Sequence, residues 1–192
     1  MALVKYNNNS LSSVTSAAGF PSGAMTLIKT ITADSASTVS FINGSSDVVF
    51  DNTHPVYLVK IINAHLDADD RSLNLNFTTD GTNFNVTKTT TFFRTTLGEN
   101  GSNQLFAYRT FADLAQSTGD QVLMIFNPSS TTFVKHFIAR TQGMSHLSVS
   151  ESTFIAGYCN TTSALTGFQF DTGGGSATTI DGTFKLYGLN DS

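Results

Sequence analysis

The densest group of acidic side chains in the sequence lies in the segment HLDADD, residues 65–70. Carboxylates at alternate positions of a loop, such as Asp67 and Asp69, can hold calcium through hard oxygen ligands. Asp70 adds a third carboxylate, but the segment lacks the sixth-position glycine and the terminal glutamate of an EF-hand loop. A solvated turn between two strands explains the same residues. We favour that turn and leave open whether Asp67, Asp69 and Asp70 bind a cation.

Glutamate occurs only at Glu99 and Glu151, and each stands beside a predicted loop without a carboxylate partner close in sequence. A paired general acid and base is therefore not indicated, and we expect both side chains to be solvated. The one cysteine, Cys159, excludes an intrachain disulfide. Nothing near it marks an activated thiol, so we expect a small buried residue at the end of a strand.

The four histidines, His54, His65, His136 and His146, form no HxH or HxxxH pair, so zinc has no local support. The sequence also has no G-x-S-x-G nucleophile motif, no P-loop and no dinucleotide-binding fingerprint. We therefore expect a protein that is not an enzyme, with no catalytic residues, no metal site and no cofactor.

Charged residues make up only 12% of the 192-residue chain, whereas about 25% is usual. Ser, Thr, Asn and Gly must supply the surface instead, which fits an extracellular or virion surface better than a cytosolic enzyme. A net charge of −4 gives no basic footprint for nucleic acid. The opening residues show no signal-peptide pattern, and no segment approaches the ~20 apolar residues of a membrane span, so we expect no membrane insertion.

Two apolar runs, residues 122–126 and 133–139, flank a turn that begins at Asn127-Pro128. Proline fixes its own φ and moves the preceding residue out of the helical region. Because the runs are rich in β-branched and aromatic residues, they predict an antiparallel hairpin. Both alternating sets of residues 133–139 are large, so we expect a central strand buried on most of both faces. His136 would then lie in the interior or at an interface.

Other strand candidates follow at short spacing. Residues 56–64 are nearly all apolar and predict a second central strand, whereas Leu73, Leu75 and Phe77 alternate with polar residues and predict a half-buried strand. The remaining candidates are residues 24–32, 38–43, 48–50, 84–86, 89–95, 105–109, 147–149, 154–158, 165–170 and 183–189.

Residues 110–117, TFADLAQS, form the one stretch with a helical pattern. About ten short strands with one helix predict an all-β chain, and we expect a single-domain antiparallel two-sheet sandwich of jelly-roll type over residues 23–192. Residues 1–22 are polar and broken up, and predict an N-terminal arm that is extended or packs on a neighbour, or else a disordered tail. The candidate interface residues of this arm are Leu3, Val4, Tyr6, Leu11 and Phe20.

Exposed aromatic rings could bind sugars by stacking. The candidates are Tyr6, Tyr57, Tyr108, Tyr158 and Tyr187, and the chain has no tryptophan. A sugar site is therefore an open alternative without a location.

Several stretches together resemble a group of small proteins encoded by marine tailed bacteriophages. They are the opening MALVKYNNNS, the central LAQSTG and FNPSSTTFVKHFIAR, the later AGYCNTTSA and the ending IDGTFKLYGL. The resemblance runs along nearly the whole chain and implies a virion structural protein, made in the host bacterial cytoplasm. It carries no assigned functional residues, and it leaves open whether the protein sits on the capsid or the tail.

We therefore expect a non-enzymatic virion structural protein that decorates and cements the capsid as a symmetric homo-oligomer, with a trimer favoured. Its partners would be other virion proteins such as the major capsid protein. The alternative is a tail or fibre component that binds a receptor or a host surface glycan. A carbohydrate-active enzyme on the same fold would need two carboxylates within about 5–10 Å in one cleft.

Overall fold

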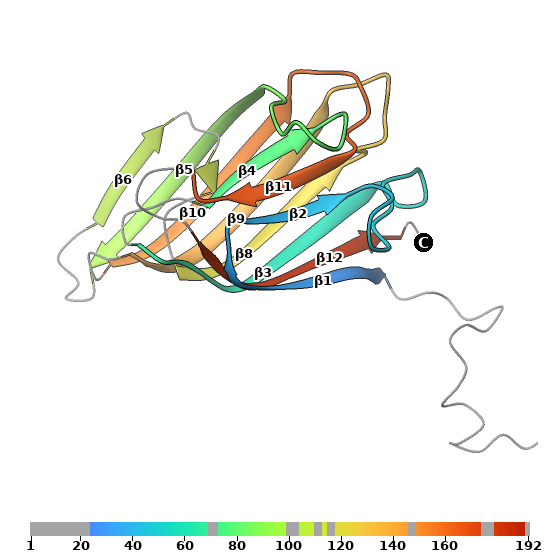
Figure 1. Ribbon diagram of the computed structural model, residues 1–192. Helices are drawn as coiled ribbons and strands as arrows, with labels where there is room; N and C mark the ends of the chain where they lie inside the picture. Colours follow the sequence, from blue (N-terminus) through green and yellow to red (C-terminus); the bar gives the residue numbers. More distant parts are fainter. Residues whose placement is uncertain are drawn as a thin grey trace, which may run out of the picture.

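The chain folds into β-strands that form two antiparallel sheets (Figure 1). The computed structural model describes residues 24–68, 73–98, 104–109, 113–114, 118–145, 149–173 and 179–190. Within these ranges there is no helix. The arm over residues 1–22, with its candidate interface residues Leu3, Val4, Tyr6, Leu11 and Phe20, lies outside the described residues.

The larger sheet has eight strands in the order β1-β12-β3-β8-β9-β10-β5-β6. Their bounds are β1 (Met25–Ala36), β12 (Ile180–Leu189), β3 (Val56–Leu66), β8 (Thr118–Phe126), β9 (Lys135–Ser145), β10 (Val149–Cys159), β5 (Lys88–Gly98) and β6 (Gln104–Arg109). The smaller sheet has four strands in the order β2-β11-β4-β7. Their bounds are β2 (Thr38–Ile42), β11 (Gly167–Asp171), β4 (Leu73–Thr78) and β7 (Asp113–Leu114).

The core lies between the two sheets and is dominated by aromatic rings. Phe168 of β11 stands at its centre, with ring centroids 5.1 Å from Phe41 and 6.4 Å from Phe77. Two ring pairs join the sheets directly, because Phe77 lies 5.3 Å from Phe137 of β9 and Phe170 lies 5.3 Å from Phe184 of β12. These contacts place one face of the larger sheet against the smaller sheet.

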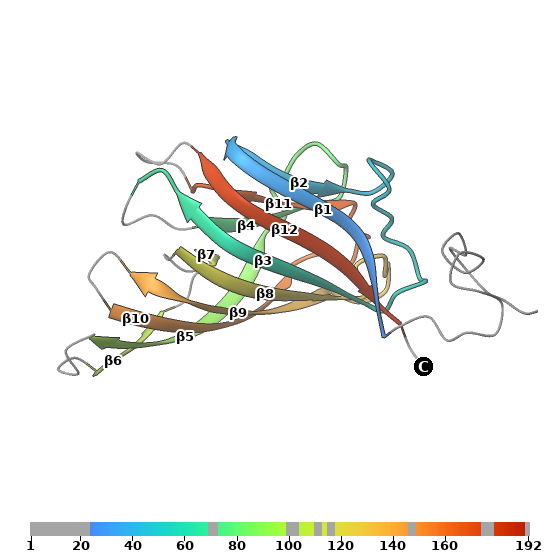
Figure 2. The ribbon, with the colours of Figure 1, turned by 90° about the horizontal axis from the view of Figure 1, so that it is seen from below.

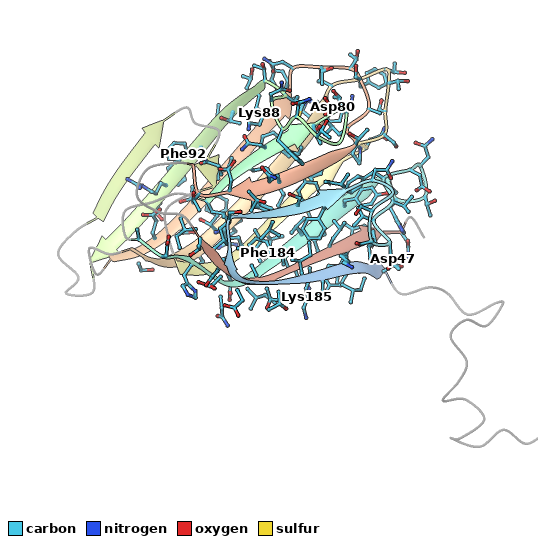
Figure 3. The ribbon with its side chains drawn as sticks, in the orientation of Figure 1. Asp47, Asp80, Lys88, Phe92, Phe184 and Lys185 are labelled. Carbon is cyan, nitrogen blue, oxygen red and sulfur yellow. The ribbon has the colours of Figure 1, made fainter. Side chains whose placement is uncertain are left out.

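Strand alternation decides which side chains enter this core. Phe184 and Leu186 of β12 are fully buried, whereas Lys185 between them is only partly buried. In Figure 3, Phe184 lies between the sheets and Lys185 lies on the opposite side of β12. Period-2 alternation is the expected behaviour of a strand covered on one face.

The predicted central hairpin is confirmed. β8 and β9 pair antiparallel with Ile125 opposite Phe137, and the turn between them begins at Asn127, which has a positive φ of 46°. The prediction of a second central strand at residues 56–64 is also confirmed, because β3 lies inside the larger sheet between β12 and β8. In β4 the predicted inward set of Leu73, Leu75 and Phe77 is buried.

The prediction that residues 133–139 are buried on most of both faces is wrong. Phe137 and Ala139 are buried, but His136 and Ile138 are exposed, and Phe133 precedes the strand and is 70% exposed. The reason is that the smaller sheet covers only one face of the larger one, so large apolar residues on the other face stay at the surface.

Three smaller predictions need correction. Residues 48–50 and 84–86 are not strands, although Val48 and Phe50 are buried in the core. Val149, the described residue of the candidate at 147–149, and the candidate at 154–158 belong to one strand, β10. Within the predicted helix at 110–117, the described Asp113 and Leu114 form β7, because they pair with the edge of β4. Tertiary pairing overrides a weak local helical pattern here.

Candidate interaction surface

The larger sheet has one face that no described strand covers. In Figure 2, β1, β12, β3, β8, β9, β10 and β5 lie side by side with no other strand in front of them. We call this side the outer face and define it by the outward residues of the central strands: Lys60 of β3, Val122 of β8, Arg140 of β9, Phe154 of β10 and Phe93 of β5. An uncovered sheet face normally carries polar side chains.

The outer face instead carries many apolar side chains. Among the residues that the structure describes, nine large hydrophobic side chains are exposed, and seven of these belong to the outer face. The seven are Met25, Leu27, Phe93, Val122, Ile138, Phe154 and Tyr158. Exposed apolar side chains that gather in one place mark an interaction site, whereas single ones are ordinary. This face could not be predicted from the sequence, because apolar residues at alternate positions give the same pattern whether they point to solvent or into the core.

The strand register aligns the outer face in rows that cross the sheet. The central row joins six strands: Lys185, Lys60, Val122, Arg140, Phe154 and Phe93 are successive cross-strand partners. Cations therefore occupy the β12–β3 end of this row, and aromatic rings occupy the β10–β5 end. The guanidinium of Arg140 lies 4.9 Å from the centroid of Phe154, and Lys60 Nζ lies 5.2 Å from the centroid of Tyr187.

The rows nearer the hairpin turn are also apolar. One row runs from Leu27 through Tyr187, Leu58, Met124 and Ile138 to the small Ala156. Leu58 is buried although it points outward, because it lies between Tyr187 and Met124. In the next row, His136 is the cross-strand partner of Tyr158, with ring centroids 5.9 Å apart.

A polar row borders this apolar area on its other side. Asp120, Gln142 and Ser152 are cross-strand partners on β8, β9 and β10. Asp120 Oδ1 accepts a hydrogen bond from the Asn63 N–H at 3.1 Å, and Gln142 Nε2 donates to Ser150 Oγ at 3.1 Å. An apolar centre with aromatic residues and Arg, bounded by polar groups, is the usual anatomy of a protein interface.

The opposite, inward face of the same strands contains the glutamate that the sequence analysis placed in a solvated loop. That prediction is wrong for Glu151, which lies in β10 and is buried. Its Oε2 lies 3.5 Å from Nη1 of Arg94, and Thr153 Oγ1 donates to Oε1 at 3.5 Å. Burial raises the pKa of Glu151, and Arg94 and Thr153 partly offset the shift. Glu99 lies outside the described residues.

The strand phase could have revealed this burial, because Glu151 alternates in step with the inward residues Thr153 and Ile155. The row of Thr153 on the inward face contains two further polar residues, Gln121 and Thr141. Both are buried, and their side chains have no hydrogen-bond partner among the described residues. We find no paired carboxylate beside Glu151 in the described part of the chain. Its contacts with Arg94 and Thr153 are those of a buried, charge-paired side chain.

The acidic segment at residues 65–70 is described only in part. Asp67 Oδ1 accepts a hydrogen bond from the Thr179 N–H at 3.1 Å, and His65 Nε2 lies 3.5 Å from Asp181 Oδ2. Asp69 and Asp70 lie outside the described residues. Among the residues that are described, no group of three or more His, Cys, Asp or Glu side chains could hold a metal ion.

Cys159 is buried at the last position of β10, as the sequence predicted. Burial raises the pKa of its thiol to about 12, although Lys88 and Lys135 partly counter this shift. The thiol therefore stays protonated near neutral pH, which disfavours its use as a nucleophile. Burial likewise lowers the pKa of Lys135, which is the cross-strand partner of Cys159.

The candidate sugar-stacking tyrosines divide into three groups. Tyr57 is buried and its hydroxyl donates to the Val49 carbonyl at 3.0 Å, so its proposed role at the surface is wrong. Tyr158 and Tyr187 lie on the outer face. Tyr6 and the side chain of Tyr108 lie outside what the structure describes.

Comparisons of the chain with models of known protein families, with curated proteins and with solved structures give no match. In the described part of the chain, no helix has the length and apolar character needed to cross a membrane.

Proposed function

We propose that this chain is a non-enzymatic structural protein of a bacteriophage virion, which decorates and cements the capsid as a symmetric oligomer. The observation that carries the proposal is the apolar outer face of the larger sheet. Full burial of one large apolar side chain contributes about 1.5–3 kcal/mol. A face with seven exposed large hydrophobic side chains therefore favours assembly with another protein surface.

The strand order supports a jelly-roll topology for this proposal. β5–β6 and β9–β10 are set aside as insertions, which leaves eight strands. Of these, the first, eighth, third and sixth in chain order lie side by side as β1-β12-β3-β8. The second, seventh, fourth and fifth form β2-β11-β4-β7. This order supports the proposal that the chain contains the interleaved Greek keys of a jelly roll, an architecture frequent in viral capsid proteins.

The sequence resemblance to small proteins of marine tailed bacteriophages points the same way and covers nearly the whole chain. Assembly on a virion also provides a means to cover sheet edges, such as the sides of β1 and β6 with which no described strand pairs. In this proposal the other partners are virion proteins such as the major capsid protein, and residues 1–22 are the segment that contacts the shell.

Deletion of the gene from the phage that encodes it tests the proposal. We expect heads that still assemble but break open at a lower temperature or under milder osmotic shock, and that regain resistance when the purified protein is added back. Heads with unchanged resistance and unchanged protein composition would contradict a decoration role.

A tail or fibre component that binds a receptor or glycan is the second candidate. It is favoured by the ring of Tyr158, which is exposed beside the exposed His136 on the outer face, because sugar rings stack on exposed aromatic faces. In that case the deletion would leave heads resistant but abolish adsorption to the host. A Tyr158→Ala variant would also lose binding on a glycan array.

A further inference from the structure

The outer face has the area, the apolar content and the charge distribution of a contact between two copies of this chain. We infer that two copies pair face to face through the outer face, about a two-fold axis that runs parallel to the strands between β8 and β9. The inference deepens the proposed function, on which it rests for the symmetric oligomer, and it replaces the trimer expected from the sequence with a two-fold contact.

The available area is sufficient for such a contact. Eight strands at about 4.8 Å spacing span about 34 Å. Three rows at about 6.8 Å along the strands add about 20 Å. The product is about 700 Å², close to the ~800 Å² that each partner contributes to a standard interface.

The charge pattern selects the arrangement of the two copies. The proposed axis places β3 of one copy opposite β10 of the other, and β12 opposite β5. Lys60 then faces Phe154 of the second copy, and Lys185 faces Phe93. Both lysines therefore meet an aromatic ring instead of another cation, which is an attractive arrangement. Arg140, the third cation of the row, faces Val122 of the second copy.

In the neighbouring row, the sizes of the side chains that face each other are also complementary. Leu58 of one copy lies opposite the small Ala156 of the other, and Met124 lies opposite Ile138. In an isologous contact each of these pairs occurs twice, because a residue of either copy meets the same partner residue of the other copy.

The mass of the full chain in solution is the first test. Size-exclusion chromatography with light scattering should give about 41 kDa, twice the 20.5 kDa of one chain. A monomer at all concentrations up to about 100 μM, or a trimer, would overturn the inference. A dissociation constant in this range is within the span expected for specific protein contacts.

Opposite charges at one position provide a sharper test. Phe154→Lys would place a cation against Lys60 of the second copy and beside its own Arg140, so we expect dimer affinity to fall at least about tenfold. Phe154→Glu should lose less affinity than Phe154→Lys, and adding Lys60→Glu to Phe154→Lys should restore it. Equal losses for both charges, or no rescue, would contradict this arrangement. Phe133→Lys is the matched control, because Phe133 is exposed outside the sheet face.

Cross-linking between two copies tests the proposed arrangement of the dimer directly. In one chain, positions 60 and 154 stand three strands apart, about 14 Å, which exceeds the ~7 Å limit between Cα atoms for a disulfide. Across the proposed contact the two sheet faces stand about 10 Å apart, which also exceeds that limit, so a short bismaleimide linker that joins two thiols across this gap takes the place of a disulfide. Lys60→Cys combined with Phe154→Cys should form covalent dimers with this linker, whereas either single variant should not. Absence of covalent dimers from the double variant would overturn the proposed axis. Cys159 does not interfere because it is buried.

These results remain distinguishable from a failure of the proposed function. A monomer whose gene deletion still weakens phage heads would reject the two-fold contact and keep the virion role. If the chain is a dimer but deletion of its gene changes nothing in the virion, the two-fold contact would be kept and the virion role rejected.

Discussion

Arg140 and Phe154 face each other across the pairing of β9 and β10, with the guanidinium carbon 4.9 Å from the ring centroid. A cation over an aromatic face holds an exposed ring in one orientation, with an attraction of about 0.5–1 kcal/mol at exposed sites. The ring therefore does not lose much freedom when a partner covers it. The outer face is in this sense preorganised for contact, which lowers the entropic cost of association.

The aromatic core predicts a large penalty for a deletion at its centre. Phe168→Ala removes a ring that contacts Phe41, Phe50, Phe77 and Phe170. We expect the free energy of unfolding to fall by about 3–5 kcal/mol, as for other buried Phe→Ala changes, measured by urea denaturation.

The matched control for that deletion is Phe133→Ala, which removes the same side chain from an exposed position. Its effect should stay within about 0.5 kcal/mol. Similar losses for Phe168→Ala and Phe133→Ala would contradict the placement of the core between the sheets.

The β-bulge in β12 predicts that Gly182 cannot be replaced. Its φ is +136°, and a Cβ there would lie 2.8 Å from the Ala64 Cα, at the register shift between Asp181 and Thr183. We expect Gly182→Ala to destabilise the fold by about 1–3 kcal/mol, the usual range for backbone strain of this kind, in thermal unfolding.

Gly44→Asn is the comparison for the bulge, because Gly44 also has a positive φ but open space around it, and asparagine tolerates the left-handed region. The loss for Gly44→Asn should be the smaller of the two. A Gly182→Ala variant as stable as the native chain would show that the bulge does not exist as described.

The buried Glu151 predicts a pH dependence of stability. Its pKa is raised in the folded state, chiefly by burial, so the folded protein retains a proton that the unfolded chain has already released. Stability therefore declines as pH rises from the ordinary value of 4.5 through the raised pKa. Glu151→Gln removes this decline, and the free energy of unfolding of the two proteins should diverge as pH rises from 4 to 8.

The informative quantity is the sign of that divergence. The native chain should lose stability relative to Glu151→Gln with rising pH. A relative gain would mean that the ion pair with Arg94 outweighs the desolvation of the carboxylate.

We expect residues 1–22 to be needed for attachment to the phage head but not for folding of the β-sheets. Residues of the described core lie between Ala33 and Leu186, so deletion of residues 1–21 should leave the urea unfolding transition nearly unchanged. Attachment to phage heads should be abolished, as measured by co-sedimentation. Normal co-sedimentation of the truncated protein would remove residues 1–22 from the account of docking.

The local sequence pattern was sufficient to predict strands and turns wherever period-2 alternation was clear or a turn was well marked. Leu73, Leu75 and Phe77 fixed the inward face of β4, and Asn127-Pro128 located the turn of the central hairpin. In both cases the signal lies within a few residues and depends little on the rest of the fold.

The outer face could not be predicted, because burial depends on which other sheet covers a strand. Ile138 and Phe137 are similar in hydrophobicity, yet Ile138 is exposed and Phe137 is buried. β7 was missed for a related reason, since Asp113 and Leu114 are strand residues only through their pairing with β4. The rows that join Lys60, Val122 and Arg140 likewise require the strand order, which one sequence does not contain.

The central claim is that the chain is a structural protein of the virion, and immunogold labelling tests it most directly. Antibodies against the chain are applied to intact purified virions and the label is located by electron microscopy. The account predicts label spread evenly over the head. Label confined to the tail or fibre tips would contradict decoration and favour receptor binding. Purified virions with no label and no peptide from this chain would contradict the virion role altogether.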